Sequence, residues 1–299
     1  MKIKVIIPAL NEEHSVDKVI KDFKRELPKS EIIVIDGFSK DNTREIAKRA
    51  GAKVIMQSVP GGKGIAVREA FRNIDADIYV MVDGDDTYPA DRVKDLIRPI
   101  IENRADIVLG TRTKKERDSM SFAHNFGNYV ITKTLNFFFK TKLTDVLTGY
   151  RAIRRDVVKN LILLEDGFAI ETEMTIKGIM EHYRTIEIPV KYKKRKGSES
   201  KLKTFKHGRI IMIALILLFR DYKPILFFGA LSLIPFMLSF ILGGIVLYSF
   251  ITSGFMNRPG MATLSAMLFL SAIQIFSMGV LLDSVKQRLR EEKERSKWK

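Results

Sequence analysis

The chain has 299 residues and a large excess of basic side chains, with 51 Lys and Arg against 35 Asp and Glu and a formal net charge of +16. This charge predicts an anionic partner, which is nucleic acid, an anionic membrane face or a phosphorylated substrate. The chain has no cysteine, which excludes disulfide bonds and thiolate metal sites, and its four histidines lack the spacing of a zinc site. A hard cation bound by oxygen ligands is not excluded.

Residues 1 to about 190 alternate short apolar runs with amphipathic stretches. The apolar runs predict strands over 4–10, 31–37, 53–57, 78–84 and 106–111. The amphipathic stretches between them predict helices over 13–27, 41–50, 64–73 and 91–102. This alternation indicates βαβ units, and therefore an α/β fold with a mostly parallel sheet and helices on both faces.

The strand over 78–84 runs directly into three carboxylates, Asp83, Asp85 and Asp86. Clustered carboxylates repel one another, so this strand end predicts a positive group nearby. Asp83 and Asp85 bracket Gly84, which allows one carboxylate to reach a metal while the other orients water or the sugar-bearing part of a ligand. Oxygen ligands of this kind favour Mg²⁺ or Mn²⁺. Taken alone, an acidic turn is more often a solvated loop. Whether this turn is a metal site therefore depends on the residues at the neighbouring strand ends.

The other strand ends carry further parts of a nucleotide site. IPALNEE (7–13) follows the first strand, VIDGFSKDNT (34–43) contains the end of the second, and GGKGIAVREAF (61–71) opens a helix. Carboxylates there can bind a base and ribose hydroxyls, and Lys63 with exposed backbone amides can bind phosphates. Read singly, Asn11 would be a helix cap and Lys63 a surface lysine. Because ligands bind beyond the carboxyl ends of parallel strands, we expect these motifs to converge on one crevice.

Beyond the α/β region the composition changes twice. Residues 191–209 are strongly basic, and the apolar stretch within 204–222 is too short to cross a bilayer, which predicts an interfacial amphipathic helix. Two longer apolar runs, about 224–251 and about 262–282, each meet the length of a membrane span. They predict a two-helix transmembrane hairpin over 223–285. The alternatives are a buried core helix in the first case and a buried helical hairpin in the second.

Charge around the hairpin predicts its orientation. The segment before it and the tail over 286–299 are basic, whereas the connector between the spans carries only Arg258. The positive-inside rule therefore predicts that the α/β region and both termini lie in the cytosol. The first residues, MKIKVIIPALNEE, agree with this because they read as a β-strand and not as a signal peptide.

The order of the motifs PALNEE, D-x2-S-x-D, GGKG and DGD resembles the GT-A glycosyltransferases of family 2 over roughly residues 1–200. TDVLTGYRAI (144–153) and RKGSESKL (195–202) are similar to motifs of the polyprenyl-phosphate sugar transferases typified by dolichyl-phosphate mannose synthase. The resemblance implies a Rossmann-like GT-A domain over 1–203 that transfers a hexose, with inversion, from a nucleotide sugar to a dolichyl or other polyprenyl monophosphate. It implies Mg²⁺ or Mn²⁺ as cofactor. GDP-mannose is the favoured donor, and UDP-glucose or another UDP-sugar is the alternative.

The resemblance also implies roles for individual residues. Those for the nucleotide and donor are Pro8, Asn11, Glu12, Asp36, Ser39, Lys63, Asp83, Gly84 and Asp85. Asp83 and Asp85 are also the metal ligands, and with Asp145 and Arg151, which face the reacting centre, they form the catalytic set. The residues expected to hold the phosphate of the acceptor are Arg112, Arg117, His124, Arg195, Ser198 and Lys201.

Three positions depart from the family's motifs. Where the family usually has Asp-Asp-Gly-Ser, this chain has DGFS at 36–39, so one carboxylate of the nucleotide pocket is absent. Many synthases carry a glutamine two residues after the second aspartate of the DGD motif, where this chain has Thr87. His124 or Asn125 falls near the position at which the family usually has an arginine that helps to bind the lipid phosphate. These departures bear on the nucleotide and the sugar more than on the reaction class.

Other classes of protein fit less well. A processive polysaccharide synthase should carry a Q-x-x-R-W motif, but the only tryptophan is Trp298 in the tail. A soluble nucleotidyltransferase would not need two spans. A nucleic-acid-binding protein fits the net charge, yet aromatics are not interleaved with the basic segment and the carboxylates would repel the backbone. A membrane adaptor or flippase accessory would not need Asp83 and Asp85. Oligomerisation through the hairpin stays open.

Overall fold

The computed structural model describes residues 1–112, 122–193 and 204–297. Residues 1–215 form one compact unit and residues 216–299 a second, so the division falls inside helix α9 (Thr204–Tyr222). Each unit is described by itself.

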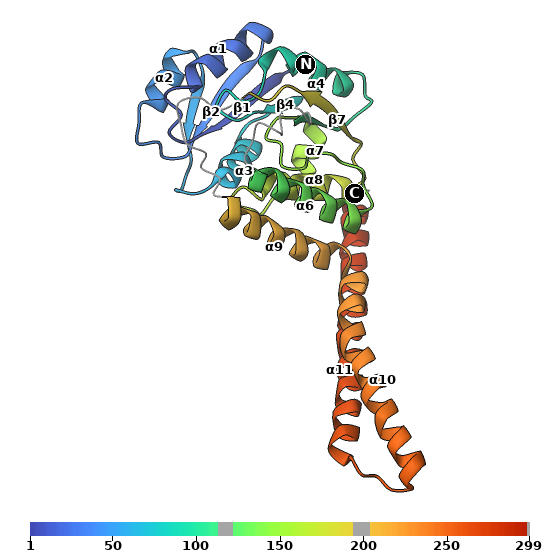
Figure 1. The fold of residues 1–299 in the computed structure, drawn as a ribbon. Coiled ribbons are helices and arrows are strands. Elements are labelled where there is room, and N and C mark those ends of the chain that lie inside the picture. Colours follow the sequence, from blue (N-terminus) through green and yellow to red (C-terminus); the bar gives the residue numbers. More distant parts are fainter. Residues whose placement is uncertain (113–121, 194–203, 298–299) are drawn as a thin grey trace. The chain divides into compact units, whose positions relative to one another are not determined.

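The first unit is built on a seven-stranded sheet with the strand order β3-β2-β1-β4-β6-β5-β7 (Figure 1). The strands are β1 (Ile3–Ala9), β2 (Glu31–Asp36), β3 (Lys53–Met56), β4 (Ile78–Met81), β5 (Ile107–Arg112), β6 (Arg151–Arg154) and β7 (Thr185–Val190). Strand β6 runs antiparallel to both of its neighbours, and the other pairs are parallel. The predicted mostly parallel α/β sheet is confirmed.

Helices cover both faces of this sheet, as predicted (Figure 1). One core contains residues of α1 (Val16–Glu26), α2 (Thr43–Arg49) and α4 (Val93–Ile101), which follows the short 3-10 helix η1 (Ala90–Arg92). The other contains residues of α3 (Lys63–Asn73), α7 (Arg155–Asn160) and α8 (Ile170–Met180). Strand β1 shows why its sequence is almost wholly apolar, because Val5 and Ile7 enter the first core and Ile6 the second.

Several elements were not predicted from the sequence. These are the helices α6 (Phe122–Phe139), α7 and α8, the antiparallel strand β6 and the strand β7. Strand β6 has only 4 residues and follows a loop without a strong turn signal, so its pattern is too short to be recognised. The predicted strands and helices before residue 112 agree with the observed ones to within a few residues at each end.

Helix α9 has the predicted bounds and two apolar faces. Ile211, Ala214 and Leu215, at helical spacing, are buried in the first unit. Ile210 and Ile213 are each more than two-fifths exposed, at 41% and 49%. An exposed apolar face on a helix that follows a basic segment suits a membrane surface.

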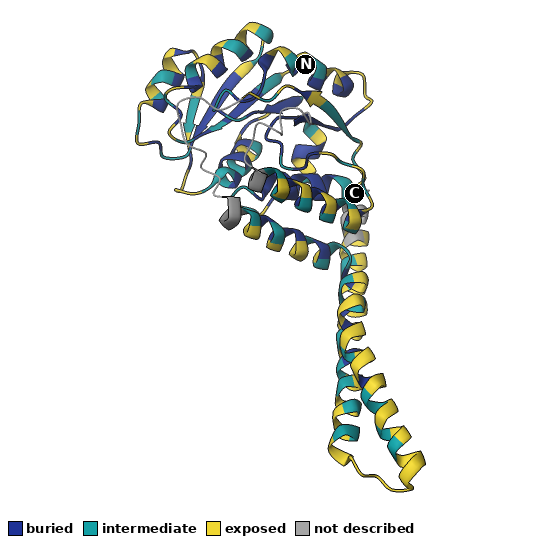
Figure 2. Ribbon diagram, in the orientation of Figure 1, coloured by how far each residue is buried: buried dark blue, intermediate teal, exposed yellow. Residues whose placement is uncertain are grey.

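The second unit contains the end of α9 and two antiparallel helices, α10 (Pro224–Ser253) and α11 (Pro259–Lys297). Both are long and apolar enough to cross a membrane, over Pro224–Ser253 and Pro259–Leu289, and both are largely exposed along their length (Figure 2). At about 1.5 Å per residue, helices of this length exceed the roughly 30 Å hydrocarbon core of a bilayer. The predicted spans lie within them, and their exposed apolar surface indicates membrane association. The tail over 286–299 continues α11 as far as Lys297.

Close contacts join the two helices of this hairpin. The Ser239 hydroxyl donates to the carbonyl oxygen of Ser265 at 2.8 Å, and the Ser265 hydroxyl donates to the carbonyl oxygen of Ser239 at 2.9 Å. A Cβ at Gly279 would lie 2.8 Å from Cβ of Phe228, so only glycine permits this approach. Small residues and hydroxyls that satisfy one another are typical of helix pairs inside membranes.

Candidate active site

A cavity of about 280 Å³ opens in the first unit, next to residues that directly follow strands β1, β2, β3 and β4. The predicted site residues that line it are Pro8, Glu12, Lys63, Asp83, Gly84, Asp85 and Arg112. Their convergence agrees with the expectation that ligands of an open parallel sheet bind at the carboxyl ends of its strands.

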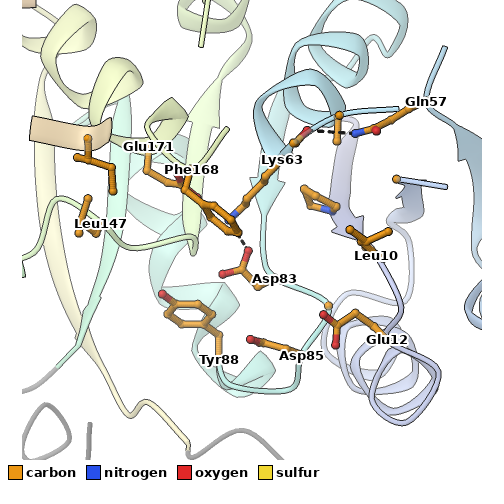
Figure 3. A pocket seen from close by; sticks show the side chains of 18 of the residues that line it. Leu10, Glu12, Gln57, Lys63, Asp83, Asp85, Tyr88, Leu147, Phe168 and Glu171 are labelled. Atoms are coloured by element: carbon orange, nitrogen blue, oxygen red, sulfur yellow. Dashed lines mark hydrogen bonds and ion pairs between the residues drawn. The ribbon is translucent and has the colours of Figure 1, made fainter. Parts of the chain in front are cut away.

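Lys63 is the positive group that the acidic strand end requires. It is the first residue of α3, and its ammonium contacts Oδ1 of Asp83 and lies 2.6 Å from Oε1 of Glu171 on α8 (Figure 3). Burial alone would lower the pKa of Lys63, but the charges and hydrogen bonds of Asp83 and Glu171 outweigh it and raise this pKa above its ordinary value. The lysine therefore stays charged at neutral pH and offsets the repulsion between the two carboxylates.

Two glycines give this cluster its room. A Cβ at Gly149, in the loop before β6, would lie 2.3 Å from Oδ2 of Asp83 and 2.8 Å from Nζ of Lys63. A Cβ at Gly64 would lie 2.1 Å from the carbonyl oxygen of Glu165. The close approach lets the Gly64 amide, in the first turn of α3, donate to the Asp166 carbonyl at 2.9 Å. Glycines of both motifs, GGKG and TGYR, are thus needed to assemble the Lys63 cluster.

The three carboxylates after β4 take different directions. Oδ1 of Asp85 accepts hydrogen bonds from the Thr87 hydroxyl at 2.6 Å and from its backbone N–H at 3.2 Å. Asp86 has a left-handed backbone, with a φ of 56°, and pairs with Lys18 on α1 at 2.7 Å. Only Asp83 and Asp85 line the cavity. Asp86 therefore contributes to the attachment of this turn to α1.

Asp83 and Asp85 form a small, oxygen-only donor set. In the described part of the chain, no group of three or more His, Asp or Glu side chains is arranged to hold a metal ion. A pair of cavity-lining carboxylates fits Mg²⁺ or Mn²⁺, because these ions are usually bound through one or two carboxylates and complete their shell with substrate phosphates and water. The donor set does not fit zinc, which prefers nitrogen and sulfur ligands.

Glu12 is held at the cavity by its surroundings. It is 7% exposed, and its backbone N–H donates to the Thr43 hydroxyl at 2.8 Å. The Ser15 hydroxyl donates to the Gly84 carbonyl at 2.8 Å, and thereby joins the start of α1 to the acidic turn. The carboxylate of Glu12 is thus placed next to Gly84 by short connections from α1 and α2.

Asn11, Asp36 and Ser39 lie behind the cavity lining. The backbone N–H of Ser39 donates to Oδ2 of the fully buried Asp36 at 3.1 Å. The backbone N–H of Asn11 donates to the Ser39 hydroxyl at 2.9 Å. The Lys40 amide donates to Oδ1 of Asn11 at 2.8 Å. These bonds tie the loops after β1 and β2 together. Within the described residues, Oδ1 of Asp36 is buried without a hydrogen-bond partner.

Arg112 and Asp145 form a second buried ion pair at the cavity. Nε and Nη2 of Arg112 donate to the two carboxylate oxygens of Asp145, each at 2.7 Å. Burial alone would lower the pKa of Arg112, but Asp145 outweighs it and raises this pKa. The guanidinium also lies 5.5 Å from the ring centre of Tyr192. Arg112 lines the cavity, whereas Asp145 is fully buried and positions the arginine.

Arg151 differs from its predicted position at the reacting centre. It is fully buried, does not line the cavity, and donates to the carbonyl oxygens of Thr148 at 2.9 Å and Val146 at 3.0 Å. It also donates to the Thr175 hydroxyl on α8 at 3.0 Å. Burial lowers the pKa of Arg151 to about 10. Its guanidinium therefore supports the loop before β6 from behind.

Some predicted acceptor residues lie outside the described residues. These are Arg117, Arg195, Ser198 and Lys201. His124 belongs to α6, but its side chain is not among those described. Their assignment to the acceptor phosphate stays a prediction.

Sequence reasoning missed several residues that line the cavity, among them Gln57, Tyr88, Phe168, Glu171 and Tyr192. Gln57 follows β3 directly, so the strand-end rule that selected Asp36 and Asp83 could have found it. Glu171 has no such signal, because it sits in the first turn of a helix far along the chain. The Tyr88 hydroxyl accepts the Gly149 amide at 3.1 Å, and thereby holds the glycine that faces Asp83.

The sheet with an acidic, lysine-clamped cavity at its strand ends defines an α/β enzyme of the GT-A type. Residues 4–162 match the family model described as glycosyl transferase family 2. Glycosyltransferase AglJ of Haloferax volcanii is 33% identical over 294 residues, which cover 97% of this chain and 96% of that protein. The chain belongs to glycosyl transferase family 2.

The names of further relatives are more specific. The dolichyl-phosphate hexose transferase of Haloferax volcanii is 32% identical over 70% of this chain and 90% of its own length. The dolichol-phosphate mannosyltransferase of Pyrococcus furiosus is 30% identical over 68% of this chain and 60% of its own length. Glucosyl-3-phosphoglycerate synthase from Mycobacterium tuberculosis, solved with Mn²⁺, UDP-glucose and phosphoglyceric acid, shares the fold with a TM-score of 0.63. That likeness covers 73% of this chain and 79% of the solved one at 21% identity.

Proposed function

We propose that the protein transfers a hexose, with inversion, from a nucleoside-diphosphate sugar to the monophosphate of a dolichyl or other polyprenyl lipid. The observation that carries this proposal is the cavity that brings Asp83, Asp85, Lys63 and Arg112 together in a chain that also has a hairpin of membrane-spanning length. The names of the Haloferax and Pyrococcus relatives support the acceptor. GDP-mannose is the first donor to test and UDP-glucose the second.

The donor binds with its diphosphate toward the acidic turn. Asp83 and Asp85 would hold Mg²⁺ or Mn²⁺, which when bound neutralises the charge that develops on the departing diphosphate. Gly84 lets a phosphate approach the backbone closely. Lys63 holds Asp83 in place, because its ammonium lies between Asp83 and Glu171. Glu12 and Pro8 line the same cavity on the side of β1.

The acceptor needs no strong base. A phosphate monoester has its second pKa at about 6, so most of the lipid phosphate is already dianionic near neutrality. One of its oxygens attacks the anomeric carbon from the face opposite the diphosphate. The bond from the anomeric carbon to the diphosphate oxygen then breaks, and the nucleoside diphosphate leaves with the electron pair. This direct displacement inverts the anomeric centre.

The remaining requirement is to bring two anionic substrates together. Arg112, which lines the cavity and is fixed by Asp145, presents a guanidinium whose geometry matches phosphate oxygens. We assign Arg117, His124, Arg195, Ser198 and Lys201 to the same task. Fixing both substrates in reacting geometry supplies much of the rate enhancement in such a reaction.

The membrane parts serve the acceptor, whose phosphate lies at the bilayer surface. The exposed apolar face of α9 and the basic segment before it would bind the cytosolic face of the membrane, while α10 and α11 anchor the chain. The excess of Lys and Arg on both sides of the hairpin supports cytosolic termini.

The test is transfer of labelled sugar into organic-extractable lipid by membranes that contain the protein. GDP-mannose, UDP-glucose and UDP-N-acetylglucosamine are supplied separately, with polyprenyl phosphate or unphosphorylated polyprenol, and with Mg²⁺, Mn²⁺ or EDTA. We expect label from GDP-mannose that requires the lipid phosphate and disappears with EDTA. Label from UDP-glucose instead would change the donor and keep the reaction. Label from no donor, or label that forms equally with polyprenol, would contradict the proposal.

A further inference from the structure

Gln57 is a buried polar residue of the cavity that the proposed chemistry does not use. It follows strand β3 directly, is 3% exposed and lines the cavity. Its Nε2 donates to the Gly62 carbonyl at 3.4 Å, before α3, as Figure 3 shows. Within the described part of the chain, its Oε1 has no hydrogen-bond partner. A buried acceptor left in this way destabilises the fold unless a donor arrives from a ligand or a water.

A second unused acceptor lies on the neighbouring strand. Oδ1 of Asp36, at the end of β2, is also buried without a partner among the described residues, while Oδ2 is occupied by the Ser39 amide. The backbone N–H of Gln57 donates to the backbone carbonyl of Asp36 at 3.0 Å, so the two residues are joined through the backbone. Of these two residues only Gln57 lines the cavity, and a ligand that satisfies its oxygen must therefore present an N–H or O–H group.

The surface beside Oε1 of Gln57 is kept free by a glycine. Gly37 lines the cavity, and a Cβ placed on it would lie 3.4 Å from the Ala9 carbonyl oxygen and 3.6 Å from Oε1 of Gln57. The absence of a side chain leaves room beside Oε1 for a flat group. Pro8 and Leu10 add apolar surface to the same part of the cavity. A planar ring with N–H groups on its edge matches this environment.

We infer that Gln57 reads the nucleobase of the donor, with its Oε1 accepting an N–H from the base. This inference rests on the proposed function, because it requires the cavity to bind a nucleotide. It names Gln57 as a residue that determines base specificity. The shared chemistry is that of a lactam base, in which a ring N–H stands next to a carbonyl, as in guanine and uracil.

The acceptor at Oε1 of Gln57 would select against other bases. Adenine and cytosine present a ring nitrogen that is an acceptor at the corresponding position, and a second acceptor would repel it. Guanine offers two adjacent N–H donors on this edge, whereas uracil offers one N–H between two carbonyls. Replacing Gln57 by Glu keeps an acceptor for the ring N–H of either base, whereas replacing it by Leu removes the acceptor.

The experiment measures binding without transfer. The full chain in detergent, with Mg²⁺, is titrated by calorimetry with GDP, UDP, ADP, CDP and pyrophosphate. We expect wild type to bind GDP or UDP at least 10-fold more tightly than ADP and CDP. Gln57→Leu should lose about 10-fold of that preference, which is about 1.4 kcal/mol, and leave pyrophosphate binding unchanged. Gln287→Leu, an exposed glutamine in the tail, is the matched control and should change nothing.

The titrations also separate the two bases and the possible failures. The tighter of GDP and UDP on wild type identifies the base, and Gln57→Glu, which keeps an acceptor, should retain more of the preference than Gln57→Leu does. A preference that survives Gln57→Leu, or a parallel loss of pyrophosphate binding that shows damage to the whole site, would overturn the inference. A wild-type protein that binds no nucleotide refutes the proposed function itself. Base-specific binding without sugar transfer would refute only the acceptor.

Discussion

Two glutamates on α8 are alike in their burial and in their ion pair with a lysine, but they face different parts of the molecule. Glu171 and Glu173 are 4% and 1% exposed, and each has Oε1 at 2.6 Å from a lysine ammonium. Because a helix turns by about 100° per residue, two residues apart means nearly opposite sides. Glu171 faces Lys63 and the cavity, whereas Glu173 faces the loop before the helix.

Glu173 and Lys177 bind groups of the loop before α8, away from the cavity. Glu173 accepts the backbone amides of Leu164 at 2.9 Å and Glu165 at 2.9 Å, and Lys177 donates to the Ile162 carbonyl at 2.6 Å. Lys63 instead joins Glu171 to Asp83, a cavity-lining carboxylate of a different element. Burial and ion pairing therefore do not distinguish an active site from a structural clamp. The cavity and the second carboxylate do.

The largest expected effect separates the two lysines. Lys63→Met leaves Asp83 and Glu171 close together without their cation, and we expect at least a 100-fold loss of sugar transfer per folded enzyme, or about 2.7 kcal/mol. Lys177→Met is the matched control and should keep transfer within about threefold. Both variants should lose stability, because breaking a buried pair costs about 3–5 kcal/mol. Thermal melting of each purified variant gives the folded fraction. Equal losses of transfer in the two variants would remove the distinction.

The two glutamates give a smaller contrast of the same kind. Glu171→Gln keeps one oxygen for Lys63 but removes a charge beside the reacting groups, and we expect about a 10-fold loss of transfer, or about 1.4 kcal/mol. Glu173→Gln leaves one backbone amide of the loop without its acceptor and should destabilise the protein by about 1–3 kcal/mol. Its transfer per folded enzyme should stay near wild type. A Glu173→Gln variant that is as stable as wild type would contradict the claim that Glu173 stabilises the loop before α8.

The smallest effect is a pH dependence on the structural side. Burial first, and the nearby Glu173 and Asp166 next, raise the pKa of Glu165 above its ordinary value of 4.5. The unfolded chain therefore releases this proton at lower pH than the folded chain does, and the protein loses stability as pH rises from 4.5 through the folded pKa. Glu165→Gln should raise the melting temperature at pH 7 by about one degree, because solvent screens much of the interaction. The difference should vanish below pH 4.5, and a gain that persists there would have another cause.

Much of the first unit was predictable because its signals are local. Apolar runs that end in Asp36 and Asp83 identify buried parallel strands and the edge at which their polar residues meet. The GGKG motif correctly placed Lys63 at the start of a helix and in the cavity. The two apolar runs near the C-terminus predicted α10 and α11 by length and composition alone.

The rest depends on contacts between segments that are distant in sequence. Glu171 reaches Lys63 only because α3 and α8 pack on the same face of the sheet, and no pattern within α8 separates Glu171 from Glu173. Arg151 belongs to a recognisable motif, yet the antiparallel strand β6 buries it behind the cavity. Sequence reasoning thus identified residue types and strand ends, whereas the direction of each side chain came from tertiary packing.

The central claim is that sugar transfer takes place at the carboxyl ends of the strands, at the turn that carries Asp85. The most direct test compares Asp85→Asn with Asp106→Asn. Asp106 is a buried aspartate just before β5 that accepts the backbone amide of Arg184 at 2.8 Å and does not line the cavity. We predict that transfer of labelled sugar to lipid per folded enzyme falls by at least 1,000-fold in Asp85→Asn, about 4.1 kcal/mol, and stays near wild type in Asp106→Asn. Transfer that survives in Asp85→Asn, or falls equally in both variants, would contradict the account.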